Sequence, residues 1–70
     1  MRLSTRNQLP GTISSIHEGE VTAIVKVVLD DGEQLVTSSI TLEAARDLGL
    51  AEGTAVIVLV KASEVSLAVE

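Results

Sequence analysis

The sequence contains no cysteine, phenylalanine, tyrosine or tryptophan among its 70 residues. The absence of cysteine excludes disulfides and thiolate metal ligands, and a single histidine, His17, is too few for a histidine-based zinc site. Small folds usually need such a cross-link, because a lone core of this size supplies only about 3–5 kcal/mol. We therefore expect one domain, residues 1–70, that is stabilised by self-association.

Positive charge is also scarce, since five Lys and Arg residues stand against ten Asp and Glu residues, giving a net charge of −5. A negative field repels nucleic acid phosphates and anionic lipid surfaces. Binders of single-stranded nucleic acid also use stacking aromatic side chains, worth roughly 1–3 kcal/mol per base, which this chain lacks. No apolar run approaches the roughly 20 residues of a membrane span, and no hydrophobic signal region follows Met1. We expect no nucleic acid partner, no membrane contact and a cytoplasmic location.

Short runs rich in Val, Ile and Leu, separated by turn signals such as Asp31-Gly32, predict an all-β fold. Residues 17–20 are predicted to form a turn, and residues 42–48 a short helix that Thr41 caps and Gly49 ends. This order of elements is that of a five-stranded OB-like barrel with one short helix between strands 3 and 4. The predicted strands are 8–16, 21–29, 33–40, 54–60 and 65–69.

Two of these strands carry more apolar surface than one small domain can cover. Residues 54–60 are apolar on both faces, and the second face of residues 21–29 is only half polar. Sheet surface that is apolar on both faces must be covered from elsewhere. In a chain this short we expect another subunit to provide the cover.

Catalytic patterns are missing from the sequence. There is no cysteine nucleophile, no glycine-rich phosphate loop and no histidine pair. The carboxylates cluster at predicted turns without the regular spacing of a calcium loop, so solvated turn charge is the simpler interpretation. We expect that the protein is not an enzyme and that no metal ion is ligated directly by its side chains.

Two polar segments beside strand ends stand out, residues 4–8 (Ser-Thr-Arg-Asn-Gln) and 61–63 (Lys-Ala-Ser). Each combines one cation with at least one hydroxyl. A frayed terminus and an ordinary turn would account for them without any ligand. The same groups also suit a tetrahedral dianion, which presents four acceptor oxygens and no donor, and therefore requires hydroxyl, N–H and cationic partners.

The stretch Ser4-Thr5-Arg6-Asn7-Gln8-Leu9-Pro10-Gly11 resembles the S-A-R-N-Q-x-x-G opening of the molbindin family, the small molybdate-binding Mop proteins and domains. The order and spacing of three later stretches are similar to that family too, so the resemblance covers essentially the whole chain. They are Ile40-Thr41, Leu48-Gly49-Leu50 with Glu52-Gly53, and Lys61-Ala62-Ser63-Glu64-Val65. The resemblance implies an OB-like homohexamer, a trimer of dimers, that binds molybdate or tungstate at subunit interfaces as an intracellular store or buffer, with no organic cofactor.

The resemblance also implies which residues bind the oxyanion. Ser4 would offer its hydroxyl, Arg6 its backbone N–H and charge, and Lys61 the main compensating charge, while Asn7 would order the segment or donate. In the family the Lys-Ala-Ser segment and the threonine before the helix are contributed across the interface. The implied set is Ser4, Arg6, Asn7, Thr41, Lys61, Ala62 and Ser63.

Two questions stay open at the level of the sequence. Thr5 stands where the family usually has alanine, and its hydroxyl could either add a donor or point away from the site. The alternative to ion binding is an oligomerisation or regulatory interaction module that carries no ion.

Overall fold

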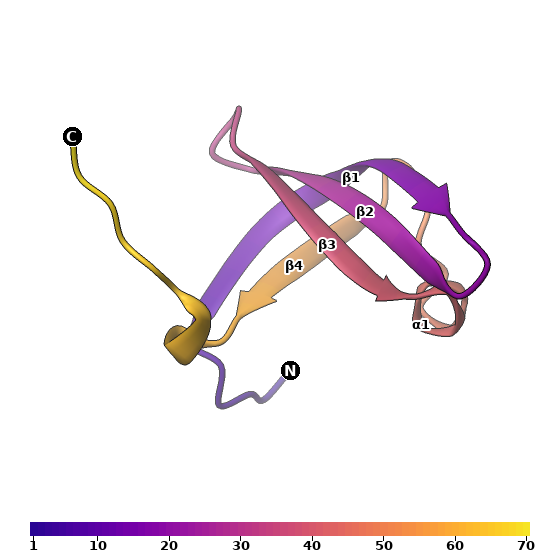
Figure 1. The fold of residues 1–70 in the computed structure, drawn as a ribbon, viewed down its shortest axis with the longest axis horizontal. Coiled ribbons are helices and arrows are strands. Elements are labelled where there is room, and N and C mark those ends of the chain that lie inside the picture. Colours follow the sequence, from indigo (N-terminus) through magenta and orange to yellow (C-terminus); the bar gives the residue numbers. More distant parts are fainter.

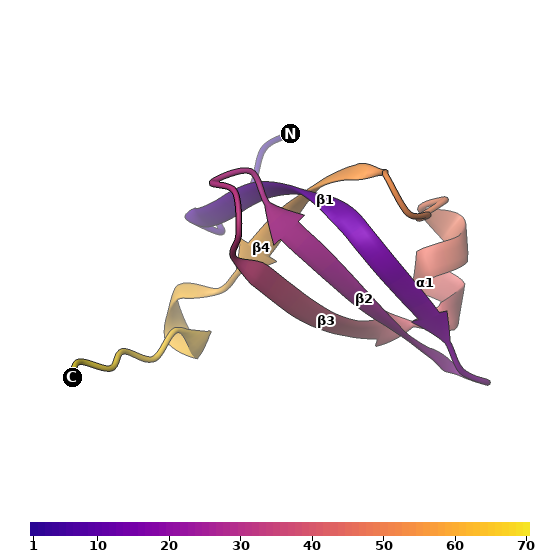
Figure 2. The same ribbon diagram turned by 90° about the horizontal axis from the view of Figure 1, so that it is seen from above.

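The computed structural model describes all 70 residues and shows a four-stranded antiparallel sheet with one short helix at its end (Figure 1). The strands lie in the order β3-β2-β1-β4, which leaves β3 and β4 as the two edges. The sheet is strongly twisted and curled, as the turned view shows (Figure 2). The elements are β1 (Asn7–Glu18), β2 (Thr22–Leu29), β3 (Leu35–Thr41), α1 (Leu42–Asp47), β4 (Ala55–Val60) and a 3-10 turn, η1 (Ala62–Glu64).

Strand β1 bends because its hydrogen-bond register shifts at a bulge between Ile13 and Ser15. The Ser14 hydroxyl, beside the bulge, donates to the Lys26 carbonyl at 3.2 Å. A bulge increases the local twist of a strand, which allows one long strand to belong to both halves of a curled sheet. In this way β1 pairs with β4 through its first half and with β2 through its second.

The core lies inside the curl and consists of small and medium aliphatic side chains. Ile13, Val25 and Val27 form its centre and are nearly inaccessible to solvent. The inward residues of β2 alternate with outward ones, as the predicted period of two requires. Only six of the 70 residues are buried, so most of the apolar surface of this single chain is still exposed.

Helix α1 closes one end of the curl and begins where the sequence predicts. The Thr41 hydroxyl accepts a hydrogen bond from the Ala44 backbone N–H at 3.0 Å, as expected of an N-cap. Gly49 follows the helix with a φ of +64°, a conformation that glycine adopts without strain. Ala45 is the helix residue that packs into the core.

The single chain differs from two predictions about secondary structure. His17 and Glu18 continue β1, pairing with Ile24 and Ala23 of β2, so the predicted turn at 17–20 begins later. Residues 65–69 form no strand, because a strand exists only with a paired neighbour and the sheet places none beside them. The chain thus has four strands rather than five. The structure has no helix with the length and hydrophobicity that a membrane span requires.

Gly11 pairs with Leu29 of β2 at a point where there is no room for a side chain. A Cβ atom at this position would approach the Val28 carbonyl oxygen to 2.6 Å and a Val27 methyl group to 2.7 Å. Real Cβ atoms essentially never come this close, and one of the two neighbours is rigid backbone. Glycine is therefore required here by the close approach of two strands.

We predict that Gly11→Ala lowers the free energy of unfolding by about 1–3 kcal/mol, the usual cost of overpacking a well-filled core. Urea denaturation at fixed protein concentration measures the change. Gly19→Ala is the matched control, since its Cβ would meet no atom closer than 3.4 Å. Equal stability of the two variants would contradict the close approach.

Candidate functional site

The pairing of β1 with β4 brings the two polar segments of the sequence together at one end of the sheet. Asn7, the first residue of β1, lies opposite Val60, the last residue of β4. The residues that precede β1 and those that follow β4 therefore leave the sheet side by side. Residues 4–6 and 61–63 become neighbours although 54 or more positions separate them in the sequence.

These two segments enclose a surface hollow of about 450 Å³. Its wall contains two cations and three hydroxyls, and no acidic residue. The hollow is wide and its residues are exposed, apart from the half-buried Thr5, so one chain forms an open cradle rather than a closed cage. The lining residues are Ser4, Thr5, Arg6, Lys61, Ala62 and Ser63.

Side-chain amides hold the N-terminal side of the hollow in place. The Asn7 amide donates to the Val60 carbonyl at 3.0 Å and thereby joins the two segments directly. The Gln8 amide donates to the Thr5 carbonyl at 2.8 Å and folds residues 5–8 into a compact loop. Asn7 is not in the wall of the hollow, so its observed contribution is to order the segment.

Several hydrogen-bond donors at the hollow have no acceptor within the chain. The backbone N–H groups of residues 4–6 take part in no backbone hydrogen bond, and no side chain accepts from them. On the other side, η1 uses the N–H groups of Glu64 and Val65, which leaves those of Ala62 and Ser63 without a partner. The hollow thus combines cations with unpaired donors, the groups that a fully deprotonated oxyanion requires.

Two predicted site residues are not in the wall of the hollow: Asn7 lies beside it, and Thr41 lies at the other end of the sheet. Thr41 ends β3 and pairs with Thr22, whereas the hollow lies at the Asn7 end of β1. β1 is 12 residues long, roughly 35–40 Å along an extended strand. Within one chain Thr41 cannot reach an ion held between Arg6 and Lys61.

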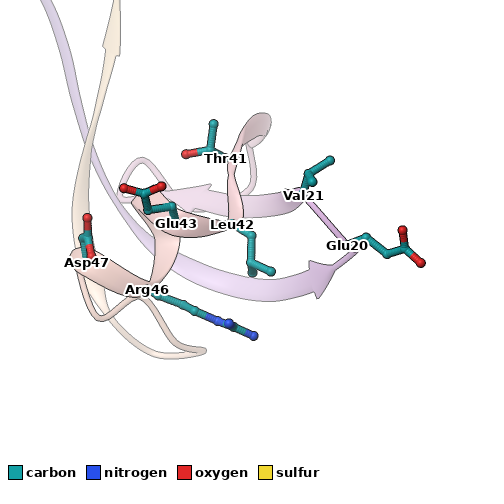
Figure 3. A pocket seen from close by; sticks show the side chains of 7 residues that line it. All are labelled: Glu20, Val21, Thr41, Leu42, Glu43, Arg46 and Asp47. Atoms are coloured by element: carbon teal, nitrogen blue, oxygen red, sulfur yellow. The ribbon is translucent and has the colours of Figure 1, made fainter.

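The surface around Thr41 is itself unsuited to an anion. A hollow of about 550 Å³ at the start of α1 has Arg46 as its one cation, against Glu20, Glu43 and Asp47 (Figure 3). Arg46 moreover forms an exposed ion pair with Glu18 at 3.6 Å. Of the two hollows, the smaller one between residues 4–6 and 61–63 has the electrostatics for a dianion.

Thr5 was left undecided by the sequence, and the structure places it in the wall of the hollow. It is also the most buried of the lining residues. Its position between Ser4 and Arg6 in a continuous polar run was the only feature of the sequence that pointed to the site. Such a run does not reveal the direction of each side chain.

Comparison with known proteins gives a consistent result for the whole chain. Residues 3–67 match the family model of the TOBE domain. Molybdenum-pterin-binding protein 3 of Clostridium pasteurianum is 39% identical over 67 residues, which are 96% of this chain and 97% of that protein.

Two solved structures are similar in both fold and sequence. A molybdate-binding protein from Sporomusa ovata superposes with a TM-score of 0.90 at 32% identity, covering 97% of this chain and 98% of the other. The cytoplasmic molybdate-binding protein ModG, crystallised with molybdate bound, has a TM-score of 0.85 at 42% identity. That match covers 91% of this chain and 45% of ModG.

We predict that Asn7→Ala separates the two walls of the hollow by removing the hydrogen bond to Val60. A hydrogen bond of this kind contributes about 1 kcal/mol, so the expected loss of global stability is small. The larger expected effect is local, with faster amide hydrogen exchange at residues 59–62 than in the parent protein. Gln8→Ala serves as the control because the Gln8 amide bonds within its own segment. Unchanged exchange in Asn7→Ala would show that the amide does not join the segments.

Proposed function

Because this chain belongs to the TOBE domain family and is a molbindin-type domain of it, we propose that it binds molybdate or tungstate in the hollow between residues 4–6 and 61–63. The observation that carries the proposal is that Arg6 and Lys61 line the same hollow and that no carboxylate lines it with them. The similar proteins described above are named for binding molybdenum-pterin or molybdate, which supports this choice of ligand. Capture and release are an equilibrium without covalent chemistry, so the protein is not an enzyme.

Each wall of the hollow has a separate role in this proposal. Lys61 and Arg6 compensate the charge of the dianion, and the hydroxyls of Ser4 and Ser63 donate to its oxygens. The unpaired N–H groups of Arg6, Ala62 and Ser63 add fixed donors. Thr5 offers a further hydroxyl, and Asn7 positions the segment without contacting the ion.

The open hollow also supports a role for neighbouring subunits. Two opposite unit charges about 4 Å apart attract by about 1 kcal/mol in bulk water and by on the order of 4 kcal/mol at an effective dielectric near 20. Covering the hollow with another subunit therefore strengthens the attraction of Lys61 and Arg6 for the ion. In this arrangement a second copy supplies Thr41, which its own chain holds at the other end of the sheet. We propose a homohexamer, a trimer of dimers, with five-stranded OB-like barrels, that stores or buffers the ion in the cytoplasm.

The proposed cage of donors also explains which anions it would reject. A protonated oxyanion such as hydrogen phosphate brings an O–H group that the cations and N–H groups of the cage cannot accept. Its proton would have to bind a hydroxyl oxygen, and the contact from that hydroxyl to a phosphate oxygen would be disturbed. Sulfate has the right charge but is smaller, so it leaves the opposing donors too far apart. Molybdate and tungstate match in both charge and size.

A second candidate function is an interaction module without a bound ion. The observation that favours it is the exposure of large apolar side chains far from the hollow, with Val21 75% and Leu48 70% exposed. Exposed apolar side chains of this size are available for contact with a protein partner, and such a contact requires no ligand.

We predict that Lys61→Ala weakens molybdate binding at least tenfold, which corresponds to about 1.4 kcal/mol. Titration calorimetry with molybdate measures the affinity, and circular dichroism checks that the fold is retained. Lys26→Ala is the matched control, because it also removes one exposed Lys but from the outer face of β2. If Lys61→Ala binds molybdate with the affinity of the parent protein, Lys61 does not contact the ion.

We also predict that molybdate raises the melting temperature of the parent protein. A ligand at 100 times its Kd stabilises the folded state by about 2.7 kcal/mol. For a domain of this size that is a shift of more than about 10 °C, since each kcal/mol is worth about 4–8 °C. Tungstate should act alike, whereas sulfate and phosphate at the same concentration should not. Identical melts in all four anions would favour the interaction module.

A further inference from the structure

Thr5 differs from the other residues of the hollow in its exposure. It is half-buried, whereas every other residue that lines the hollow is exposed. Its hydroxyl forms no hydrogen bond within the chain. Polar groups that are withdrawn from solvent normally have a hydrogen-bond partner. The Thr5 hydroxyl is therefore available to donate to a ligand in the hollow.

The backbone of Thr5 is tied to the sheet through Gln8. The Gln8 side-chain amide donates to the Thr5 carbonyl oxygen at 2.8 Å, and Gln8 itself pairs with Leu59 of β4. Threonine is branched at Cβ, which restricts rotation about χ1. The position of the Thr5 hydroxyl is thus constrained by the bond to Gln8 and by the stiffness of its own side chain.

The two cations of the hollow, Arg6 and Lys61, are held much less firmly. Both are exposed, and neither forms an ion pair or a side-chain hydrogen bond within the chain. Their long side chains have many rotamers, so the charged groups can follow anions of different sizes. A cation that adjusts to its ligand attracts every dianion to a similar degree. Arg6 and Lys61 therefore supply affinity but little discrimination.

We propose that Thr5 is a selectivity-determining residue, and that its hydroxyl raises the preference of the hollow for molybdate over the smaller sulfate. This inference rests on the proposed function and deepens it. A donor with a fixed position bonds well only to an ion that reaches it while also contacting the opposite wall, residues 61–63. Sulfate reaches one wall and leaves the other donor too far away.

The contrast between fixed and mobile donors is the physical basis of this selectivity. Specificity is a difference between two affinities, so only a contact that one ion makes and the other lacks can contribute to it. The charge of Lys61 acts on both ions, whereas the Thr5 hydroxyl acts on the larger one. Alanine is usual at this position in the family that the sequence resembles, so the hydroxyl is a feature of this chain.

The test compares the affinities of the parent and of Thr5→Val for two anions. Valine keeps the shape and the branched Cβ of threonine and removes the hydroxyl. Calorimetry should show that the Kd for molybdate rises about tenfold, the loss expected for one hydrogen bond to a charged oxygen. Sulfate affinity is measured by displacement, with molybdate held at the Kd of each variant. The sulfate concentration that releases half of the bound molybdate should be unchanged.

Three further variants separate the hydroxyl from other causes. Thr5→Ser restores the hydroxyl and should recover most of the molybdate affinity. Thr37→Val removes an exposed hydroxyl from the outer face of β3 and should behave like the parent. Lys61→Ala should weaken molybdate and sulfate by the same factor, because its charge attracts both.

Gln8 provides an independent check, because it positions Thr5 without lining the hollow. Gln8→Ala removes the bond to the Thr5 carbonyl and so frees the hydroxyl to move. We expect the molybdate affinity to fall in this variant and the sulfate affinity to stay the same. The double variant of Gln8→Ala with Thr5→Val should bind molybdate no more weakly than Thr5→Val, since both changes remove the same contact.

Equal weakening of both anions in Thr5→Val, or parent affinity for both, would overturn the inference. A Gln8→Ala variant that keeps the parent's preference for molybdate would overturn it too. The proposed function fails in a different way, since the parent itself would then not bind molybdate, and the inference would fall with it. If the parent binds molybdate and Lys61→Ala weakens that binding, a failure at Thr5 concerns selectivity alone.

Discussion

The pairing of β1 with both of its neighbours is the constraint on which the rest of the structure depends. β1 pairs with β4 over residues 7–12 and with β2 over residues 11–18, so the two ladders overlap only at Gly11 and Thr12. A strand that changes partners along its length forces the sheet to curl at the overlap. Gly11 permits the necessary close approach to β2, and the bulge at residues 13–15 turns the second half. The hollow at one end of the sheet is a consequence of this pairing.

The electrostatics of the hollow show how an acidic chain can still attract an anion. The net charge is −5, yet none of the ten acidic residues lines the hollow that contains Arg6 and Lys61. At physiological ionic strength, exposed charges are largely screened beyond about 8 Å. Local cations therefore outweigh the global field at the short distances of direct contact. The global charge still matters for partners that contact a large surface, such as nucleic acids.

Local patterns in the sequence predicted most of the fold. The central strands, the hairpin at Gly32, the capping by Thr41 and the stop at Gly49 all follow from a period of two or from turn and cap chemistry, and the structure confirms them. The predicted end of β1, at residue 16, came two residues too early, because charged residues such as Glu18 are tolerated on an exposed strand. The fifth strand was predicted from alternation alone, but alternation does not supply a paired neighbour.

The hollow could be predicted only in part, because its formation depends on a non-local contact. Asn7 and Val60 are 53 positions apart, and no local pattern indicates that they are opposite each other. The family resemblance selected the residues of both walls but assigned them to different subunits, whereas in this structure residues 4–6 and 61–63 lie together in one chain. Thr41, which the resemblance also selected, lies at the other end of the sheet, where it pairs with Thr22. The direction of the Thr5 side chain needed the three-dimensional structure.

Lys61, Ala62 and Ser63 form one wall of the hollow and are fixed to the sheet at one end only. They follow β4, which is anchored in one sheet, and precede residues 65–69, which are unpaired in the single chain. A segment fixed at one end loses conformational entropy when it closes on an ion. The cost is about 1–2 kcal/mol for each backbone residue that becomes ordered, and it reduces the affinity for the ion. Contact with a neighbouring subunit would order Lys61, Ala62 and Ser63 before the ion arrives. Assembly would then raise the affinity for the ion without adding a contact to it.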